Sequence, residues 1–301
     1  MLSLHTNSAA LSAQNSIGRT QSALSTSQTR LSTGFRVNSA MDDAAGLQIA
    51  TRLKAQTSGM AMAMRNTQNS ISMLQTAEGA FDEVTTMLTR MKDLATQAAD
   101  ASSTAKDQAA LQSEYDALGS ELNNVMKNTT FGGAKLLDGG SIASAMTFQI
   151  GASKSETMSM DLTTAMTTLT TSLGTVSARY AAGGAAVGVE ISDGSDGTAA
   201  GATNTAGQTA ANATIDTIST AIDQVGSVRS SLGATANRLD HVYNNLSNIS
   251  TNTKAATGRI MDTDFAAESS NMTSSQMLLQ AGTAMLKQSN STSSLVMSLL
   301  Q

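Results

Sequence analysis

The sequence has no cysteine, no proline and no tryptophan, and only 3% of its residues are aromatic. Without cysteine the chain forms no disulfide, thiolate metal site or thiol nucleophile, and its fold is independent of the redox state of its compartment. Without proline, the chain lacks the residue that most strongly disrupts a helix. The 18 methionines supply flexible apolar side chains instead of aromatic ones. This composition favours long helices packed along aliphatic seams over a compact, aromatic-rich core.

Charge is also sparse, because only 14% of the residues are charged and the net charge is −5. The basic face of a nucleic-acid-binding protein is therefore missing, and we expect no nucleic-acid partner. No window approaches the roughly 18 apolar residues of a membrane span, so we expect no membrane insertion. Residues 1–8 contain neither a cationic stretch nor a continuous apolar run, which argues against a cleavable secretory signal there.

A seven-residue apolar repeat dominates the first half of the chain. The repeat comprises Leu53, Met60, Thr67, Leu74, Phe81, Leu88 and Ala95. It predicts one helix from about residue 46 to 99, roughly 80 Å long at about 1.5 Å per residue. Residues 111–125 and 218–260 keep the same period. We therefore predict a mainly α fold in which long antiparallel helices from both halves of the chain form a bundle.

The middle of the chain, about 130–214, loses this repeat and is rich in Gly, Ser, Thr and Ala. Apolar and polar residues alternate over 146–150 and again over 158–162, on either side of a turn that begins at Gly151, as in a β-hairpin. Residues 183–209 are rich in turn-forming residues and poor in large apolar ones. We expect a small outer region that contains the hairpin, with strands or turns in place of helices.

The two terminal segments have few charges and widely spaced aliphatic side chains. Residues 1–34 contain only Arg19 and Arg30 as formal charges, and residues 269–301 contain only Lys287. Little would hold such helices folded alone, so we expect them to fold and bury their faces when copies of the chain assemble. The residues expected to carry this polymerisation are Leu4, Leu11, Ile17, Leu24, Leu31, Leu278, Leu286, Leu295 and Leu299.

The first terminal helix should end at a glycine. Gly34 has the position of a glycine that terminates a helix in a left-handed conformation, and an irregular connector follows. Ser39, with Asp42 three residues later, resembles a capping box, and the carboxylates of Asp42 and Asp43 would face the next helix N-terminus. The predicted connector and cap consist of Gly34, Arg36, Asn38, Ser39, Asp42 and Asp43.

The sequence offers little material for catalysis or metal binding. His5 and His241 lie in different predicted helices, and no metalloprotease or phosphate-binding motif occurs. A group of acidic residues at 262–268 fits a helix start better than a cation site, since it lacks the glycine and the ligand spacing of a calcium loop. The acidic turns at 193–197 are read as plain turns. We predict no catalytic residue, no metal and no cofactor, and the sequence leaves open whether central Ser and Thr side chains carry sugars.

Five segments resemble the signatures of bacterial flagellins. Residues 31–50 read LSTGFRVNSAMDDAAGLQIA, and the later blocks are SLGA at 231–234, NRL at 237–239, GRIMDTDFA at 258–266 and QAGTAML at 280–286. The resemblance covers about residues 1–165 and 215–301. Residues 287–290 and Gly258 depart from the family's usual residues at those positions, which affects inferences about filament form but leaves the family resemblance intact.

The resemblance implies a non-enzymatic structural subunit, exported by the flagellar type III apparatus, that polymerises into the extracellular flagellar filament used for swimming. It implies inner-core helices at 1–45 and 262–301, an outer-tube bundle with the hairpin at 46–165 and 215–261, and a small variable surface region at 166–214. Implied partners are identical subunits, the export apparatus and its chaperone, and hook-associated and cap proteins. The alternative is a hook–filament junction protein, which shares the terminal signatures. An exported adhesin or enzyme would need a larger head than residues 163–214 provide.

The resemblance also implies a surface patch for the flagellin-sensing Toll-like receptor of vertebrates. Arg90, Leu94 and Glu114 match the residues that carry this interaction in the family. The repeat places Leu88 and Ala95 in the seam, so we expect Arg90 and Leu94 on another, exposed face. The alternative is that this face packs between neighbouring subunits, and the two interpretations are compatible if the receptor binds the monomer.

Overall fold

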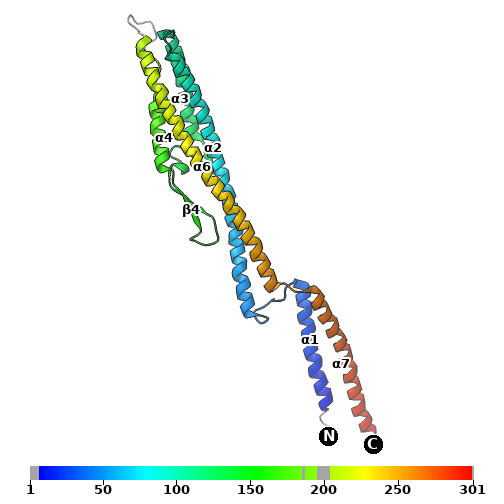
Figure 1. The fold of residues 1–301 in the computed structure, drawn as a ribbon. Helices are drawn as coiled ribbons and strands as arrows, with labels where there is room; N and C mark the ends of the chain where they lie inside the picture. Colours follow the sequence, from blue (N-terminus) through cyan, green and yellow to red (C-terminus); the bar gives the residue numbers. More distant parts are fainter. Residues whose placement is uncertain (1–6, 185–186, 195–203, 300–301) are drawn as a thin grey trace. The chain divides into compact units, whose positions relative to one another are not determined.

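The computed structural model describes residues 7–184, 187–194 and 204–299, with side chains described up to residue 292 except that of residue 204 (Figure 1). The chain is mainly helical, as predicted. The helices are α1 (Ser8–Thr33), α2 (Ala44–Ala98), α3 (Ala105–Asn128), α4 (Thr163–Val176), α5 (Ala178–Ala181), α6 (Asn204–Met261) and α7 (Phe265–Leu299), with a 3-10 turn η1 (Ser141–Ala143). The strands are β1 (Thr130–Phe131), β2 (Ala134–Lys135), β3 (Met146–Gln149) and β4 (Thr157–Met160).

The described chain forms two compact units. One contains residues 1–58 and 249–301, and the other contains residues 59–248. The boundary lies within α2 and α6. The expected inner-core and outer-tube layers concern an assembled filament, and their limits remain a prediction.

The central unit is a bundle of α2, α3, α4 and α6 (Figure 1). The predicted long helices are confirmed, and the repeat positions Leu74, Phe81, Leu88 and Ala95 are at most 1% exposed. Arg229 on α6 lies 3.0 Å from a carboxylate oxygen of Asp82 on α2, which ties the two helices together. The side chains of Thr104 and Asp107 form a reciprocal capping box at the start of α3. The bundle thus joins segments that are distant in sequence, as the repeat indicated.

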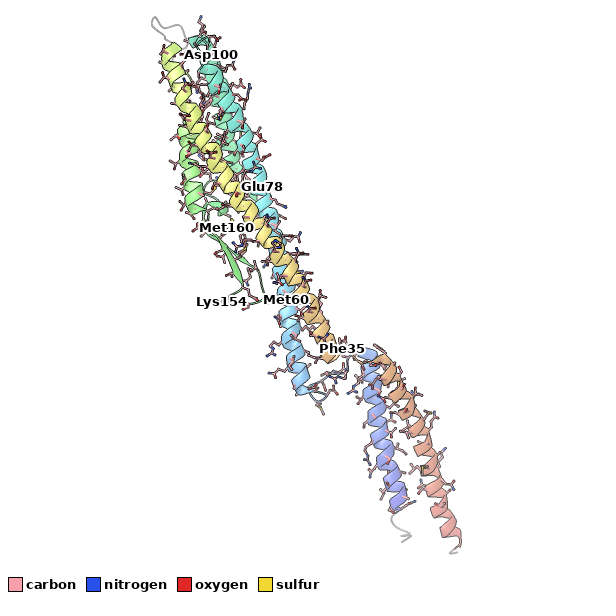
Figure 2. All side chains as sticks on the ribbon, in the orientation of Figure 1. Phe35, Met60, Glu78, Asp100, Lys154 and Met160 are labelled. Carbon is pink, nitrogen blue, oxygen red and sulfur yellow. The ribbon has the colours of Figure 1, made fainter. Side chains whose placement is uncertain are left out.

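The predicted hairpin is also confirmed, with β3 antiparallel to β4 and Phe148 opposite Met158. Phe148, Met158 and Met160 turn inward and join the core, with Met160 at the base of the hairpin and Lys154 at its turn (Figure 2). The turn lies against α2 at Gly59, where an added Cβ would come within 2.6 Å of the Ala152 Cβ. Glycine at this position therefore allows the hairpin to approach the helix closely.

The expectation of strands and turns beyond the hairpin was wrong. Residues 163–176 form helix α4, and α6 begins at Asn204, well before the predicted start of the late helix. The apolar residues of α4 recur at helical spacing, and Met166, Leu169, Leu173 and Val176 are all at most 1% exposed. The threonines between these apolar residues favour strands and so concealed the helical spacing. In the helix the Thr167 and Thr171 hydroxyls instead donate to backbone carbonyls one turn earlier.

A buried polar network fixes residues 187–191 on α3. The Gln112 amide nitrogen donates to Asp116 at 2.9 Å and to Glu190 at 2.8 Å, while its oxygen accepts from the Ile191 N–H at 2.8 Å. Asp116 also lies 3.4 Å from the Arg179 guanidinium. Such a network stabilises a segment when its buried groups are paired, so these contacts, together with the buried Ile191, position residues 187–191 on α3.

Tyr115 anchors the end of α4 beneath this network. Its side chain is fully buried and its hydroxyl donates to the Val176 carbonyl at 2.7 Å. Burial, with the nearby charges of Glu190 and Asp116, raises the pKa of the Tyr115 phenol far above its usual range. The hydroxyl therefore remains a donor throughout the neutral pH range.

We predict that Tyr115→Phe lowers the free energy of unfolding of the monomer by about 1 to 2 kcal/mol, because the buried Val176 carbonyl loses its donor. Urea unfolding followed by circular dichroism measures the change. The matched control is Tyr243→Phe, since Tyr243 is half-buried and has no hydrogen bond recorded among the described residues. Equal stability of the two variants would contradict the role of this bond.

Candidate functional site

Helices α1 and α7 pair along their length within the terminal unit (Figure 1). At one end Asn7 Nδ2 donates to the backbone oxygen and the hydroxyl of Ser289 at 3.3 and 3.2 Å. At the other end Arg30 lies 3.7 Å from Glu268, whose side chain is only 10% exposed. Between them an added Cβ on Gly282 would lie 3.0 Å from Ile17, so glycine lets the helices approach. These contacts fix an antiparallel register for the pair.

The outward faces of this pair carry large apolar side chains. Leu11 is 52% exposed, Leu278 62% and Met285 70%. A groove of about 470 Å³ runs between the helices, and its lining includes Ile17, Leu278 and Met285. Pairing α1 with α7 therefore buries one side of each helix and leaves an apolar surface available to another molecule.

The predicted polymerisation residues divide into three groups. Leu11 and Leu278 are exposed, whereas Ile17, Leu24, Leu31 and Leu286 are half-buried at or beside the pair's seam. Leu4 lies outside the described residues, and Leu295 and Leu299 lie in α7 beyond its described side chains. Met277 and Met285, which belong to the same spaced apolar residues of the C-terminal segment, are also exposed.

The connector between α1 and α2 pairs with the segment between α6 and α7. Gly34 terminates α1 with φ 77°, the left-handed conformation predicted for it. The Arg36 N–H donates to the Met261 carbonyl at 2.6 Å, and the Thr263 N–H donates to the Gly34 carbonyl at 3.0 Å. The exposed Phe35, which forms a β-bridge with Asp262, lies in this connector (Figure 2). The Arg36 guanidinium donates to the Ile260 carbonyl at 3.0 Å and so ties the same two segments.

The predicted Ser39 cap of α2 is corrected in its details. Helix α2 begins at Ala44, and the residue that caps it is Asp43, whose carboxylate accepts from the Gly46 N–H at 2.8 Å. Asp42 instead closes the preceding turn by accepting from the N–H groups of Ser39 and Asn38. These backbone donors hold the pKa of the Asp42 carboxyl below its usual range. The two adjacent carboxylates thus have separate roles. Ser39 lies about one helical turn before Asp43 and is therefore too early in the chain to cap α2.

The expected receptor patch is only partly assembled at the surface. The Arg90 Nη2 donates to a Glu114 carboxylate oxygen at 2.6 Å, and both side chains are about half exposed. Leu94, expected on the same exposed face, is 1% exposed and belongs to the core. The expectation failed for Leu94 because α2 is covered by α3 as well as by α6, which buries a wider stripe than a single seam would.

The candidate catalytic and metal-binding residues are dispersed. Asp264 stands before α7 and accepts from the Ala266 N–H at 2.9 Å, and Glu268 pairs with Arg30. Within the described residues no group of three His, Asp or Glu side chains gathers in a way that could hold a metal ion. His241 lies exposed on α6, while His5 and Asp196 fall outside the described residues.

None of the described helices is both long enough and apolar enough to span a bilayer.

Family comparisons match both ends of the chain. Residues 4–141 match the bacterial flagellin N-terminal helical region, and residues 215–300 match the bacterial flagellin C-terminal helical region. The chain is 35% identical to Flagellin A of Vibrio anguillarum and 36% identical to Flagellin A of Vibrio cholerae serotype O1, over 100% of each chain.

A solved Vibrio parahaemolyticus structure, provisionally described as a flagellar hook-associated protein, covers 73% of this chain and is itself covered completely, with a TM-score of 0.57 and 17% identity. That likeness concerns the fold alone. The matches at both ends and the full-length relatives establish that the chain belongs to the bacterial flagellins, the non-enzymatic structural subunits of the extracellular flagellar filament.

Proposed function

We propose that the outward apolar surface of α1 and α7 is the main polymerisation surface of this flagellin. The observation that carries the proposal is the exposure of Leu11, Leu278 and Met285 on a helix pair that is almost free of charge. Burying one large aliphatic side chain is worth about 1.5 to 3 kcal/mol, so covering several of them by neighbouring subunits offsets the entropy lost on assembly.

From the same surface we also infer that the terminal unit is more stable in the assembled filament than in the free monomer. A single pair of helices buries only the facing stripe of each, which is a small core for so many ordered residues. We infer that α1 and α7 reach their full stability when several copies pack together, with residues 1–45 and 262–301 as the inner layer and residues 46–165 and 215–261 around it. We infer that the region 166–214, whose helix α4 contributes to the core of the central unit, faces the outside of the filament.

Further partners follow from membership of the family. We infer export by the flagellar apparatus, a chaperone that covers the C-terminal segment before assembly, and contacts with hook-associated and cap proteins at the filament ends. The exposed Met277 and Leu278 support binding of a chaperone to this segment, since they would otherwise promote aggregation in the cell. A hook–filament junction role is less well supported, and a purified junction protein would not extend into long fibres by itself.

We predict that Leu278→Ser and Met285→Ser each raise the critical concentration for polymerisation about tenfold or more, because each removes apolar area that only assembly buries. The unfolding free energy of the central unit should not change. Sedimentation of filaments grown from purified chain measures the effect. Gln280→Ser, an exposed polar change on the same helix, is the matched control. Normal polymerisation of the Leu278→Ser Met285→Ser double variant would refute the proposed surface.

We also infer that the monomer engages the flagellin-sensing Toll-like receptor through Arg90 and Glu114. The ion pair presents a guanidinium held by a carboxylate on the neighbouring helix, a preorganised arrangement typical of residues that dominate interfaces. Leu94 supports this surface from beneath, because its buried side chain positions the turn of α2 that carries Arg90.

We expect Arg90→Ala to weaken receptor activation by monomer about tenfold, the size typical for loss of an arginine anchor. Arg65→Ala, an exposed change elsewhere on α2, should have little effect. Leu94→Ala should act mainly by lowering the stability of the fold, by about 2 to 5 kcal/mol for a buried leucine. A reporter-cell assay with monomer of verified fold measures activation, and full activity of the Arg90→Ala Glu114→Ala double variant would overturn the assignment.

A further inference from the structure

A second groove lies in the central unit, between strand β4 and helix α6. It has a volume of about 370 Å³. Its lining consists of Ile150, Thr157, Met158, Ser159, Arg238, His241 and Val242. The groove thus combines an apolar floor with two hydroxyls and two basic side chains.

No acidic side chain lines this groove, and the carboxylates nearest to it in sequence are bonded within their own segments. Asp240 accepts from the Asn244 amide at 3.3 Å, Asp161 accepts from the Thr163 N–H at 3.0 Å, and Glu156 accepts from the Ser153 N–H at 2.7 Å. Arg238 has no ion pair recorded within the described part of the chain. The groove therefore presents an uncompensated cation, which favours an anionic occupant.

The central unit carries a complementary strip on α2 and α3. Arg90 on α2 bonds Glu114 on α3, which defines where the two antiparallel helices face each other. Glu83 precedes Arg90 by two helical turns, and Glu121 follows Glu114 by two turns, so both glutamates lie on the same exposed strip. Neither glutamate has a hydrogen bond or ion pair recorded among the described residues. The strip therefore presents two exposed carboxylates for which no cation partner is recorded among the described residues.

We propose that the groove between β4 and α6 receives the α2–α3 strip of a second copy of this chain, with Glu83 and Glu121 facing Arg238 and His241. The proposal rests on the filament role of the chain and assigns it a lateral contact beyond the terminal helices. The groove and the strip share no residue, so the contact is heterologous, and its repetition generates an open helical assembly when the rotation between copies does not close a ring. The hydroxyls of Thr157 and Ser159 can donate to the same carboxylates.

A charge-reversal cycle tests this contact in the polymer. Arg238→Glu and Glu121→Arg should each raise the critical concentration for polymerisation about threefold, the range expected for an interfacial ion pair near solvent, and the double variant should return close to the parent value. Lys154→Glu, which reverses an exposed cation on the hairpin turn outside the groove, is the control and should match the parent. Additive losses in the double variant, or no change in any variant, would overturn the proposal.

Cross-linking gives an independent readout, because the chain has no cysteine of its own. Ser159 lies in the groove, and Ala117 lies exposed on α3 between Glu114 and Glu121. Oxidised filaments of the Ser159→Cys Ala117→Cys variant, grown on parent seeds, should yield a ladder of covalent oligomers, while Thr167→Cys Ala117→Cys filaments should not. Filaments whose Ser159→Cys and Ala117→Cys thiols react with maleimide but form no ladder refute this contact. The terminal polymerisation surface is refuted separately, by normal assembly of the Leu278→Ser Met285→Ser variant.

Discussion

The fold of this flagellin depends on one geometric constraint, which is that two helices cannot bury each other's whole apolar surface. In the central unit α2 is flanked by α3 and α6, so residues on several of its sides, such as Phe81, Leu88 and Leu94, are buried within one chain. Among the described residues of the terminal unit α1 packs mainly on α7, and side chains such as Leu278 remain exposed. The number of neighbours per helix thus separates the central unit, whose apolar side chains are buried within one chain, from the terminal unit, where large apolar side chains stay exposed.

Sequence periodicity predicted those elements whose partners lie along a regular seam. The repeat through Leu74, Phe81 and Leu88 located α2, the alternation around Gly151 located the hairpin, and Gly34 ends α1 as expected. Leu94 was misplaced because a single-seam assumption ignores a second neighbouring helix. Helix α4 was not predicted because its many threonines, which favour strands, outweighed the helical spacing of its apolar residues. The network around Gln112 and Glu190 joins residues separated by 78 positions, and no local pattern reports such a pairing.

Several carboxylates of this chain begin helices and close turns. Asp43, Asp107 and Asp264 accept backbone N–H groups at the starts of α2, α3 and α7. Hydrogen bonds from Ser102 and Thr163 likewise lower the pKa of Asp100 and Asp161. A lowered pKa means that each bond contributes fully at neutral pH and is lost only as the pH falls through the lowered value. A charge-poor chain thereby keeps its helix boundaries well defined.

The register of α1 against α7 has a kinetic consequence. Asn7 and Ser289 are 282 positions apart, so the first helix meets its partner only after nearly the whole chain is present. Contacts of such high sequence separation form late, since the loop between them must first be ordered. Until then α1 is an unpartnered helix in water, and its many Ser, Thr and Gln residues keep it from acting as a continuous hydrophobic surface. The polar residues of α1 thus limit the aggregation of this helix while its partner α7 is still missing.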